Sequence, residues 1–201
     1  MPDAAAPPSS PDAQLLMAAA SGDVDGVSRA LAAGAALESR DMRGRSALLL
    51  AVADDHLAVA QLLVACGADP NALDDLNDTP WLATGVSCSV AMLKALLPAG
   101  PDMTLRNRYG GISVIPASER GHVEYVRRVV RTGIDVDHVN DLGWTALLEA
   151  VILGDGSPPY QEIVGILLAA GADPLLADRQ GVTALQHARA LGHHSLAALL
   201  S

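Results

Sequence analysis

A glycine that recurs every 33 residues constrains the fold of this 201-residue chain more than any other feature. The series is Gly34, Gly67, Gly100 and Gly133, with Gly171 following after 38 residues. A second series has the same period and places an Asp or Asn three residues before a Gly or Asn. The first residues of these pairs are Asp41, Asp74, Asn107, Asn140 and Asp178. A fixed period of this length indicates small units that stack in a line.

Each unit is predicted to be a turn followed by two short helices. Asp or Asn at the first turn position with Gly at the fourth is typical of a type I turn. Ser46, Thr79, Thr145 and Thr183 then fall where a hydroxyl can cap a helix N-terminus. The periodic glycine follows a pair of Leu or Val residues and suits the left-handed residue that ends a helix. Such a helix pair cannot bury its apolar face alone, so the units must pack on one another.

These motifs resemble the ankyrin repeat. Thr79-Pro80-Trp81-Leu82 and Thr145-Ala146-Leu147-Leu148 are similar to that family's Thr-Pro-Leu-His tetrad, and Gly121-His122 and Gly192-His193 are similar to its Gly-His pair. The resemblance implies an all-α solenoid of stacked helix-turn-helix units with turn or hairpin tips. The tetrad's His is replaced in every unit, so we expect the hydrogen-bond ladder it makes between repeats to be absent.

The repeat also predicts the domain organisation. Residues 1–7 are expected to be a disordered tail, and residues 8–201 a single domain. The expected units are 8–40, 41–73, 74–106, 107–139, 140–177 with a five-residue insertion, and a truncated 178–201.

The aromatic residues are few enough to be assigned one by one. Half of the residues are apolar, yet only 2% are aromatic and none is Phe, which suits thin layers filled by Ala, Leu and Val. Trp81 and Tyr125 occupy apolar positions of the repeat and are predicted to lie in the core. Tyr109, Trp144 and Tyr160 fall where the repeat requires nothing apolar. Trp, Tyr and Arg are enriched at interface hot spots, so these three rings are candidate contact residues.

The candidate binding surface follows from the resemblance. In the ankyrin family the turn tips and the exposed side of each first helix form a concave binding face, and the resemblance implies the same here. We predict a groove centred on Tyr109 and Trp144. The other residues predicted to contact a partner are Arg43, Arg45, Arg108 and Arg179, together with Leu76, Asp78, Glu119, Leu142 and Leu153. The alternative interpretation is that the two rings only lean on the adjacent tip and cover its backbone.

Charge and cysteine usage restrict the partners and the compartment. A net charge of −10 disfavours nucleic acid and anionic membrane surfaces. The longest stretch without a charged residue, 79–93, has 15 residues and is shorter than the roughly 20 that span a bilayer. Residues 1–11 have no cationic start and no apolar run, so we expect no signal peptide. Cys66 and Cys88 are too few for a disulfide framework and are expected to be reduced and buried. We therefore expect a cytoplasmic protein, and the preference for Arg over Lys indicates a GC-rich bacterial source.

No motif for catalysis is present. The chain has no phosphate-binding loop, no His-Glu-x-x-His, no nucleophile elbow and no Cys-x-x-Cys. We predict a non-catalytic protein–protein interaction module without metal or other cofactor, which binds a partner protein on its concave face as a monomer. A second interpretation is an inhibitor or immunity-type protein that blocks a partner enzyme. A third is a small-ligand receptor or enzyme built on the insertion around residues 154–160, with Tyr160 and His138 nearby.

Overall fold

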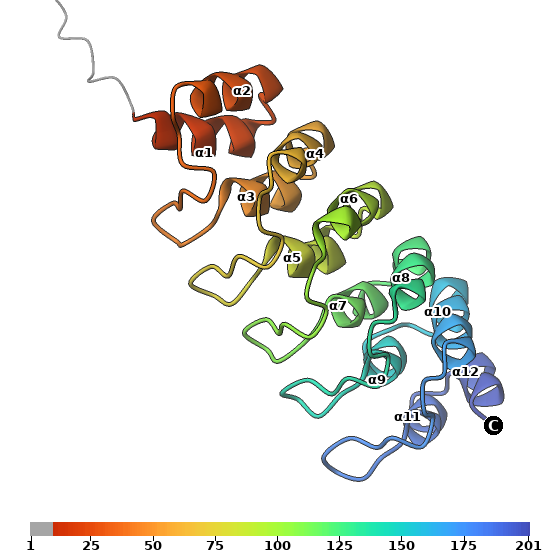
Figure 1. Ribbon diagram of the computed structural model, residues 1–201. Coiled ribbons are helices and arrows are strands. Elements are labelled where there is room, and N and C mark those ends of the chain that lie inside the picture. Colours follow the sequence, from red (N-terminus) through yellow and green to blue (C-terminus); the bar gives the residue numbers. More distant parts are fainter. Residues whose placement is uncertain (1–9) are drawn as a thin grey trace, which may run out of the picture.

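The structure is a computed structural model that describes residues 10–201, and these residues form a line of helix pairs (Figure 1). The first helices of the pairs are α1 (Pro11–Ser21), α3 (Ala47–Ala53), α5 (Pro80–Ser87), α7 (Val114–Glu119), α9 (Ala146–Ile152) and α11 (Ala184–Ala190). The second helices are α2 (Val24–Ala32), α4 (Leu57–Ala65), α6 (Val90–Leu96), α8 (Val123–Val129), α10 (Pro158–Ala169) and α12 (His194–Leu199). Short 3₁₀ turns, Leu97–Ala99 and Val130–Thr132, follow α6 and α8. The predicted tail, residues 1–7, lies outside the described residues.

The pairs stack in register, as the repeat requires. First helices pack on first helices, α3 against both α1 and α5 and α7 against α9, and second helices pack on second helices, α4 against α6 and α8 against α10. Loops join the pairs and project on one side of the stack (Figure 1). In residues 10–201 the extended backbone amounts to two isolated bridges, Arg40–Ser46 and Ala177–Thr183. The predicted all-α solenoid is confirmed.

The local turn and capping predictions are confirmed as well. The Thr79 hydroxyl accepts a hydrogen bond from the Leu82 N–H at 3.0 Å, and the Ser46 hydroxyl accepts one from the Leu49 N–H at 3.1 Å. Thr145 and Thr183 cap α9 and α11 in the same way. The five periodic glycines all have positive φ, from 69° to 97°, which is the left-handed conformation that ends a helix.

The core is built mainly from Ala, Leu and Val side chains, with two aromatic residues in its centre. Trp81 is fully buried and Tyr125 is 1% exposed, as predicted for both. The Tyr125 hydroxyl shares a 2.6 Å hydrogen bond with the Thr84 hydroxyl of the preceding unit. The prediction for Cys66 is wrong, because this residue ends α4 at the surface and its thiol is exposed; Cys88 is half-buried.

Side chains in the loops after the second helices link neighbouring units. Each accepts a hydrogen bond from a backbone N–H of the next unit. The pairs are Glu38 with the Asp69 N–H at 3.0 Å, Asn71 with the Asp102 N–H at 2.7 Å, and Asp137 with the Asp173 N–H at 2.9 Å. At the tetrad's fourth position, Leu49, Leu82, Ile115 and Leu148 are buried apolar residues. In residues 10–201 the tetrad positions therefore make no polar ladder, and polar contacts between units are made by these loop side chains and by pairs such as Thr84 with Tyr125.

Gly85 in α5 marks a close approach between units. A Cβ atom at this position would lie 2.1 Å from the Ser113 carbonyl oxygen of the next unit. We therefore expect Gly85→Ala to lower the free energy of unfolding by about 1–3 kcal/mol in urea denaturation, because the two backbones must separate. Gly165→Ala in α10 is the matched control, since its Cβ would meet nothing within 4 Å. That change should raise stability by about 0.5–1 kcal/mol, and equal effects at the two sites would contradict the prediction.

Candidate functional site

The five tips, residues 41–45, 74–78, 107–111, 140–144 and 178–182, are built by one hydrogen-bond pattern. In each, the side-chain oxygen of the first residue accepts the N–H groups of the residues two and four positions later. In the third of these tips, Asn107 accepts from the Tyr109 N–H at 2.9 Å and from the Gly111 N–H at 3.0 Å. Because the backbone of each tip is held by its own side chain, the residues between these bonds have defined positions.

The face formed by the tips and the first helices, called here the concave face, contains two cavities. The Tyr109 cavity has a volume of about 490 Å³ and lies between the tips 107–111 and 140–144. Its other lining residues come from α7 and α9 and the residue after α9; they are Ile115, Pro116, Glu119, Glu149 and Leu153. The Leu76 cavity has a volume of about 380 Å³ and lies between the tips 41–45 and 74–78. Its lining below the tips is mainly apolar and consists of Leu49, Ala53, Ala83 and Val86, together with Ser87.

Most of the predicted contact residues line these two cavities rather than one groove. Arg108, Tyr109, Glu119, Leu142 and Leu153 line the first. Arg43, Arg45, Leu76 and Asp78 line the second.

Trp144 and Arg179 line neither cavity. Trp144 is half-buried against the core, and the Arg179 side chain lies over the Gly143 backbone of the preceding tip. The structure therefore favours the covering role for Trp144, whereas Tyr109 is 60% exposed.

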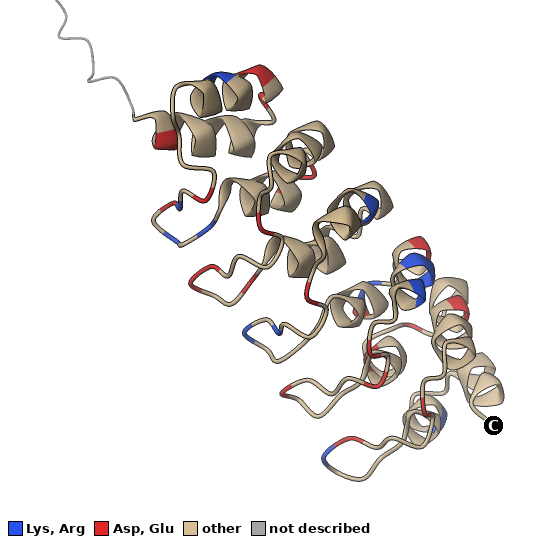
Figure 2. Cartoon of the chain, viewed as in Figure 1, with Lys and Arg blue, Asp and Glu red and all other residues tan. Residues whose placement is uncertain are grey.

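Neighbouring tips are joined in two different ways. Beside each cavity the two tips share a backbone hydrogen bond: the Asp75 N–H donates to the Arg43 carbonyl and the Asp141 N–H donates to the Tyr109 carbonyl, both at 3.0 Å. Between the two cavities the contact is an ion pair, with Arg108 Nη1 3.6 Å from Asp78 Oδ2. The Arg108 guanidinium also lies 4.8 Å from the centre of the Tyr109 ring, within range of a cation–π interaction. The tips carry charges of both signs (Figure 2).

Glu149 is a functional candidate that the sequence reasoning missed. It lies on α9 at the Tyr109 cavity and is 5% exposed. The Asn140 amide donates to its Oε1 at 2.6 Å. Burial and then the nearby charge of Glu119 raise the pKa of Glu149 to about 7, although the Asn140 hydrogen bond opposes the shift. The signal in the sequence was one carboxylate within the otherwise apolar segment 146–152.

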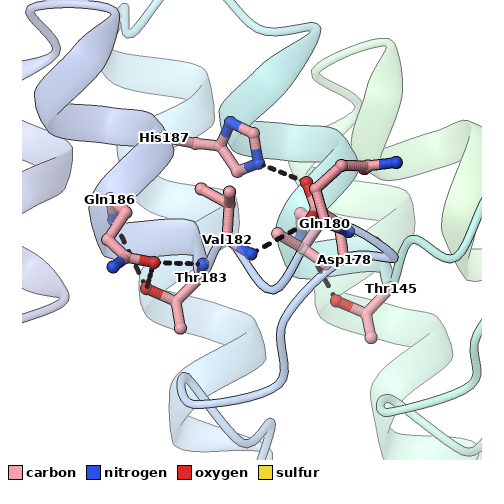
Figure 3. Close-up of polar contacts among 8 residues, drawn as sticks. Thr145, Asp178, Gln180, Val182, Thr183, Gln186 and His187 are labelled. Atoms are coloured by element: carbon pink, nitrogen blue, oxygen red, sulfur yellow. Dashed lines mark hydrogen bonds and ion pairs between the residues drawn. The ribbon is translucent and has the colours of Figure 1, made fainter.

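The last unit has a different pair at the two corresponding positions, 38 residues further along the chain. There Asp178 replaces Asn140 and His187 replaces Glu149, and His187 Nε2 lies 2.7 Å from Asp178 Oδ2 (Figure 3). The hydrogen bond from the Val182 N–H is the main cause of a lowered pKa at Asp178. The acid of this pair thus has a basic partner within its own unit. Glu149 has an amide as its partner instead.

The insertion does not form a second site with the residues named for it. The Tyr160 hydroxyl donates to the Glu119 carbonyl at 3.1 Å, and His138 Nε2 lies 2.7 Å from the Gly110 carbonyl oxygen. Tyr160 therefore contacts backbone of the preceding unit, and His138 contacts backbone of the tip in its own unit. Within residues 10–201, no group of three His, Cys, Asp or Glu side chains is arranged to hold a metal ion. The longest helix in that range, α10, has 12 residues, and none is long and apolar enough to cross a bilayer.

A line of helix pairs with hydrogen-bonded tips on one side defines a repeat solenoid. The chain belongs to the ankyrin-repeat family: a family profile of three ankyrin repeats matches residues 81–178, and a profile of a single ankyrin repeat matches residues 43–75. The fold is in general a protein-interaction module, and members of the family are in general non-catalytic.

Individual relatives agree along almost the whole chain. The ankyrin repeat protein YahD of Escherichia coli (strain K12) is 39% identical over 189 residues, which cover 94% of each chain. The crystal structure of an ankyrin repeat domain from Acinetobacter baumannii AYE is 46% identical, with a TM-score of 0.89 and coverage of 92% of this chain and 95% of that one. The crystal structure of EF0377, an ankyrin repeat protein, is 35% identical, with a TM-score of 0.89 and coverage of 94% and 96%.

Proposed function

We propose that this protein is a non-catalytic module that binds one partner protein on its concave face. The observation that carries the proposal is the pair of cavities beside Tyr109 and Leu76. Both combine exposed apolar or aromatic side chains with arginines, and hot-spot residues of these kinds fill or line pockets near the centre of protein interfaces. Tyr109 is the strongest candidate, because its ring is 60% exposed at the edge of the larger cavity.

The backbone of the face is suited to tight binding because little of it has to be ordered. Side-chain hydrogen bonds already fix each tip, and backbone hydrogen bonds join the tips beside each cavity. Ordering of loops at an interface opposes binding, so a preformed surface retains more of its contact free energy. We also propose that the protein acts as a monomer in the cytoplasm of a bacterium, where the exposed thiol of Cys66 would stay reduced.

Inhibition of a partner enzyme is the second candidate function. The observation that favours it is the net charge of −10 together with the carboxylates Glu119 and Glu149 at the Tyr109 cavity. An acidic face would be attracted to a positively charged active-site cleft. Stoichiometric loss of the partner's activity on adding this protein would distinguish an inhibitor from a scaffold, which should leave that activity intact.

Tyr109→Ala tests the proposed face. After a partner has been isolated by pull-down from the source organism and purified, we expect this change to weaken its binding by about 2 kcal/mol, roughly thirtyfold, because the exposed ring is lost from the cavity edge. Isothermal calorimetry measures the affinity. The melting temperature should change little because Tyr109 is exposed.

Arg128→Ala on α8 is the control, since it removes an exposed side chain from the second-helix side of the stack. It should leave the affinity unchanged. Unchanged affinity in the Tyr109 variant, or equal losses in both variants, would argue against the concave face as the binding surface.

A further inference from the structure

The Tyr109 cavity holds more negative than positive charge. Glu119, Glu149 and Asp141 line it, and Arg108 is the one basic residue among its lining residues. The Arg108 guanidinium is already engaged, over the Tyr109 ring and 3.6 Å from Asp78 of the preceding tip. The cavity therefore presents carboxylates for which the described part of the chain supplies no free cation.

Among the acidic residues of the cavity, Glu149 is the one whose carboxylate is buried and only partly hydrogen-bonded. Its Oε1 accepts the Asn140 amide; within residues 10–201 its Oε2 accepts no hydrogen bond and is open to the cavity, since it is not one of the buried unpaired atoms. A carboxylate that is 5% exposed and has one oxygen unpaired is costly to keep ionised. The matching position of the last unit shows the contrast, because there His187 pairs with Asp178 (Figure 3). A cationic group entering the cavity would pair with the ionised form of Glu149.

The walls of the cavity select among cationic groups. Tyr109 offers an aromatic ring, Leu142 and Leu153 offer apolar surface, and Glu119 offers a second carboxylate. A guanidinium group is planar, stacks on aromatic rings, is weakly hydrated and donates hydrogen bonds to two acceptors at once. An ammonium group is compact and strongly hydrated, and it gains less from a ring and an apolar wall. A metal ion fits less well, since no three side chains among residues 10–201 converge to hold one.

We propose that the Tyr109 cavity takes the guanidinium group of an arginine side chain of the partner protein, with Glu149 and Glu119 as its acceptors. This inference rests on the proposed function, because it names the chemistry of the partner at that face. Glu149 forms the floor of the subsite and Tyr109 and Leu142 form its walls. Arg108 stays paired with Asp78 at the edge of the subsite.

A library of random short peptides, displayed on phage and selected on the intact protein at about pH 8, tests the proposal. We expect arginine to be enriched at one position of the selected peptides. Replacing that arginine by citrulline, its neutral isostere, should weaken binding to the wild-type protein by about tenfold or more, as measured by fluorescence polarisation with the synthetic peptide. On Glu149→Gln the same replacement should have a clearly smaller effect, about threefold, because only Glu119 remains as a charged acceptor.

Two controls separate a binding role of Glu149 from a structural one. Glu149→Gln keeps an oxygen for the Asn140 amide, and its melting curve establishes that it is folded. Glu124→Gln on α8 removes the same charge from an exposed position away from the cavity and should leave peptide affinity unchanged. Binding to the wild-type protein should also strengthen by about tenfold between pH 6 and pH 8 as Glu149 ionises, and this dependence should disappear in Glu149→Gln.

The outcomes distinguish this inference from the proposed function. Selected peptides that prefer lysine or no basic residue would overturn the arginine subsite. So would a citrulline replacement that weakens binding to Glu149→Gln as much as it weakens binding to the wild-type protein. If those peptides still lose affinity with Tyr109→Ala or Leu76→Ala, the concave face stands as the binding surface. Failure to select any peptide sensitive to these two changes would count against both.

Discussion

Trp81→Ala should lower the free energy of unfolding by about 3–5 kcal/mol. Trp81 is fully buried in α5, and it is the largest side chain of the core. Its removal leaves a cavity in the third of six helix pairs, where units on both sides depend on the contact. In a stack of nearest-neighbour interactions, a weak central unit separates the two ends of the array. We therefore expect urea denaturation to show both a lower midpoint and a shallower or biphasic transition.

Trp144→Ala is the matched comparison, because it removes the chain's other tryptophan from a half-buried position in a tip. We expect a loss of about 1 kcal/mol and a transition that stays single. A loss of similar size in both variants would mean that the central position of Trp81 has no special weight. The two single-tryptophan proteins also report separately on the core and on the tip by fluorescence.

Glu149→Gln should stabilise the protein by about 2 kcal/mol at pH 8 and leave its stability unchanged at pH 4. The folded protein holds the pKa of Glu149 at about 7, above its ordinary value of 4.5. Between these two values the unfolded chain has released the proton while the folded chain retains it, so the stability of the wild type falls as the pH rises from 4.5 to 7. Above pH 7 both states are ionised and the loss is constant. The variant lacks this penalty.

Urea denaturation at several pH values measures the difference in free energy of unfolding between the wild type and Glu149→Gln. The titration of groups that the two proteins share cancels in this difference. Asp178 is one such group. Its lowered pKa stabilises the folded protein when the pH is above the pKa that Asp178 has in the unfolded chain, and this contribution is lost as the pH falls. A gap between the curves that is independent of pH would show that Glu149 does not titrate in this range. Stabilisation on removing Glu149 is also what a residue retained for binding would produce, since functional sites commonly lower stability.

The features that could be predicted from sequence are those with local causes. Thr79 and Thr145 cap helices because a hydroxyl at that position reaches a backbone N–H three residues on, whatever the neighbours are. Asn107 and Asn140 shape their tips by the same kind of short-range bond. The period then repeats these local solutions, so the solenoid follows.

The cavities depend on contacts between units, which a repeat pattern does not contain. Trp144 occupies the tip position held by Arg45, Asp78 and Gly111 in earlier units. The repeat pattern alone predicts that all four residues are exposed. In the structure Trp144 packs against the core. Glu149 lies within an apolar helical segment, and only the neighbouring tip and Glu119 make it the floor of a cavity. These properties arise from the sizes of facing side chains, and the structure is needed to see them.

Because two kinds of contact alternate between neighbouring tips, the concave face holds its two cavities at a set spacing. Backbone hydrogen bonds join the tips at each cavity, and the Arg108–Asp78 ion pair bridges the interface between them. A partner that fills both cavities must carry two anchor groups separated by that interface. Once one anchor is seated, the second is held at a high effective concentration if the spacing matches and gains nothing if it does not. Selectivity would then come from the spacing of the partner's anchor groups as much as from their chemistry. Salt would screen the Arg108–Asp78 ion pair and so weaken the contact that holds the two cavities at this spacing.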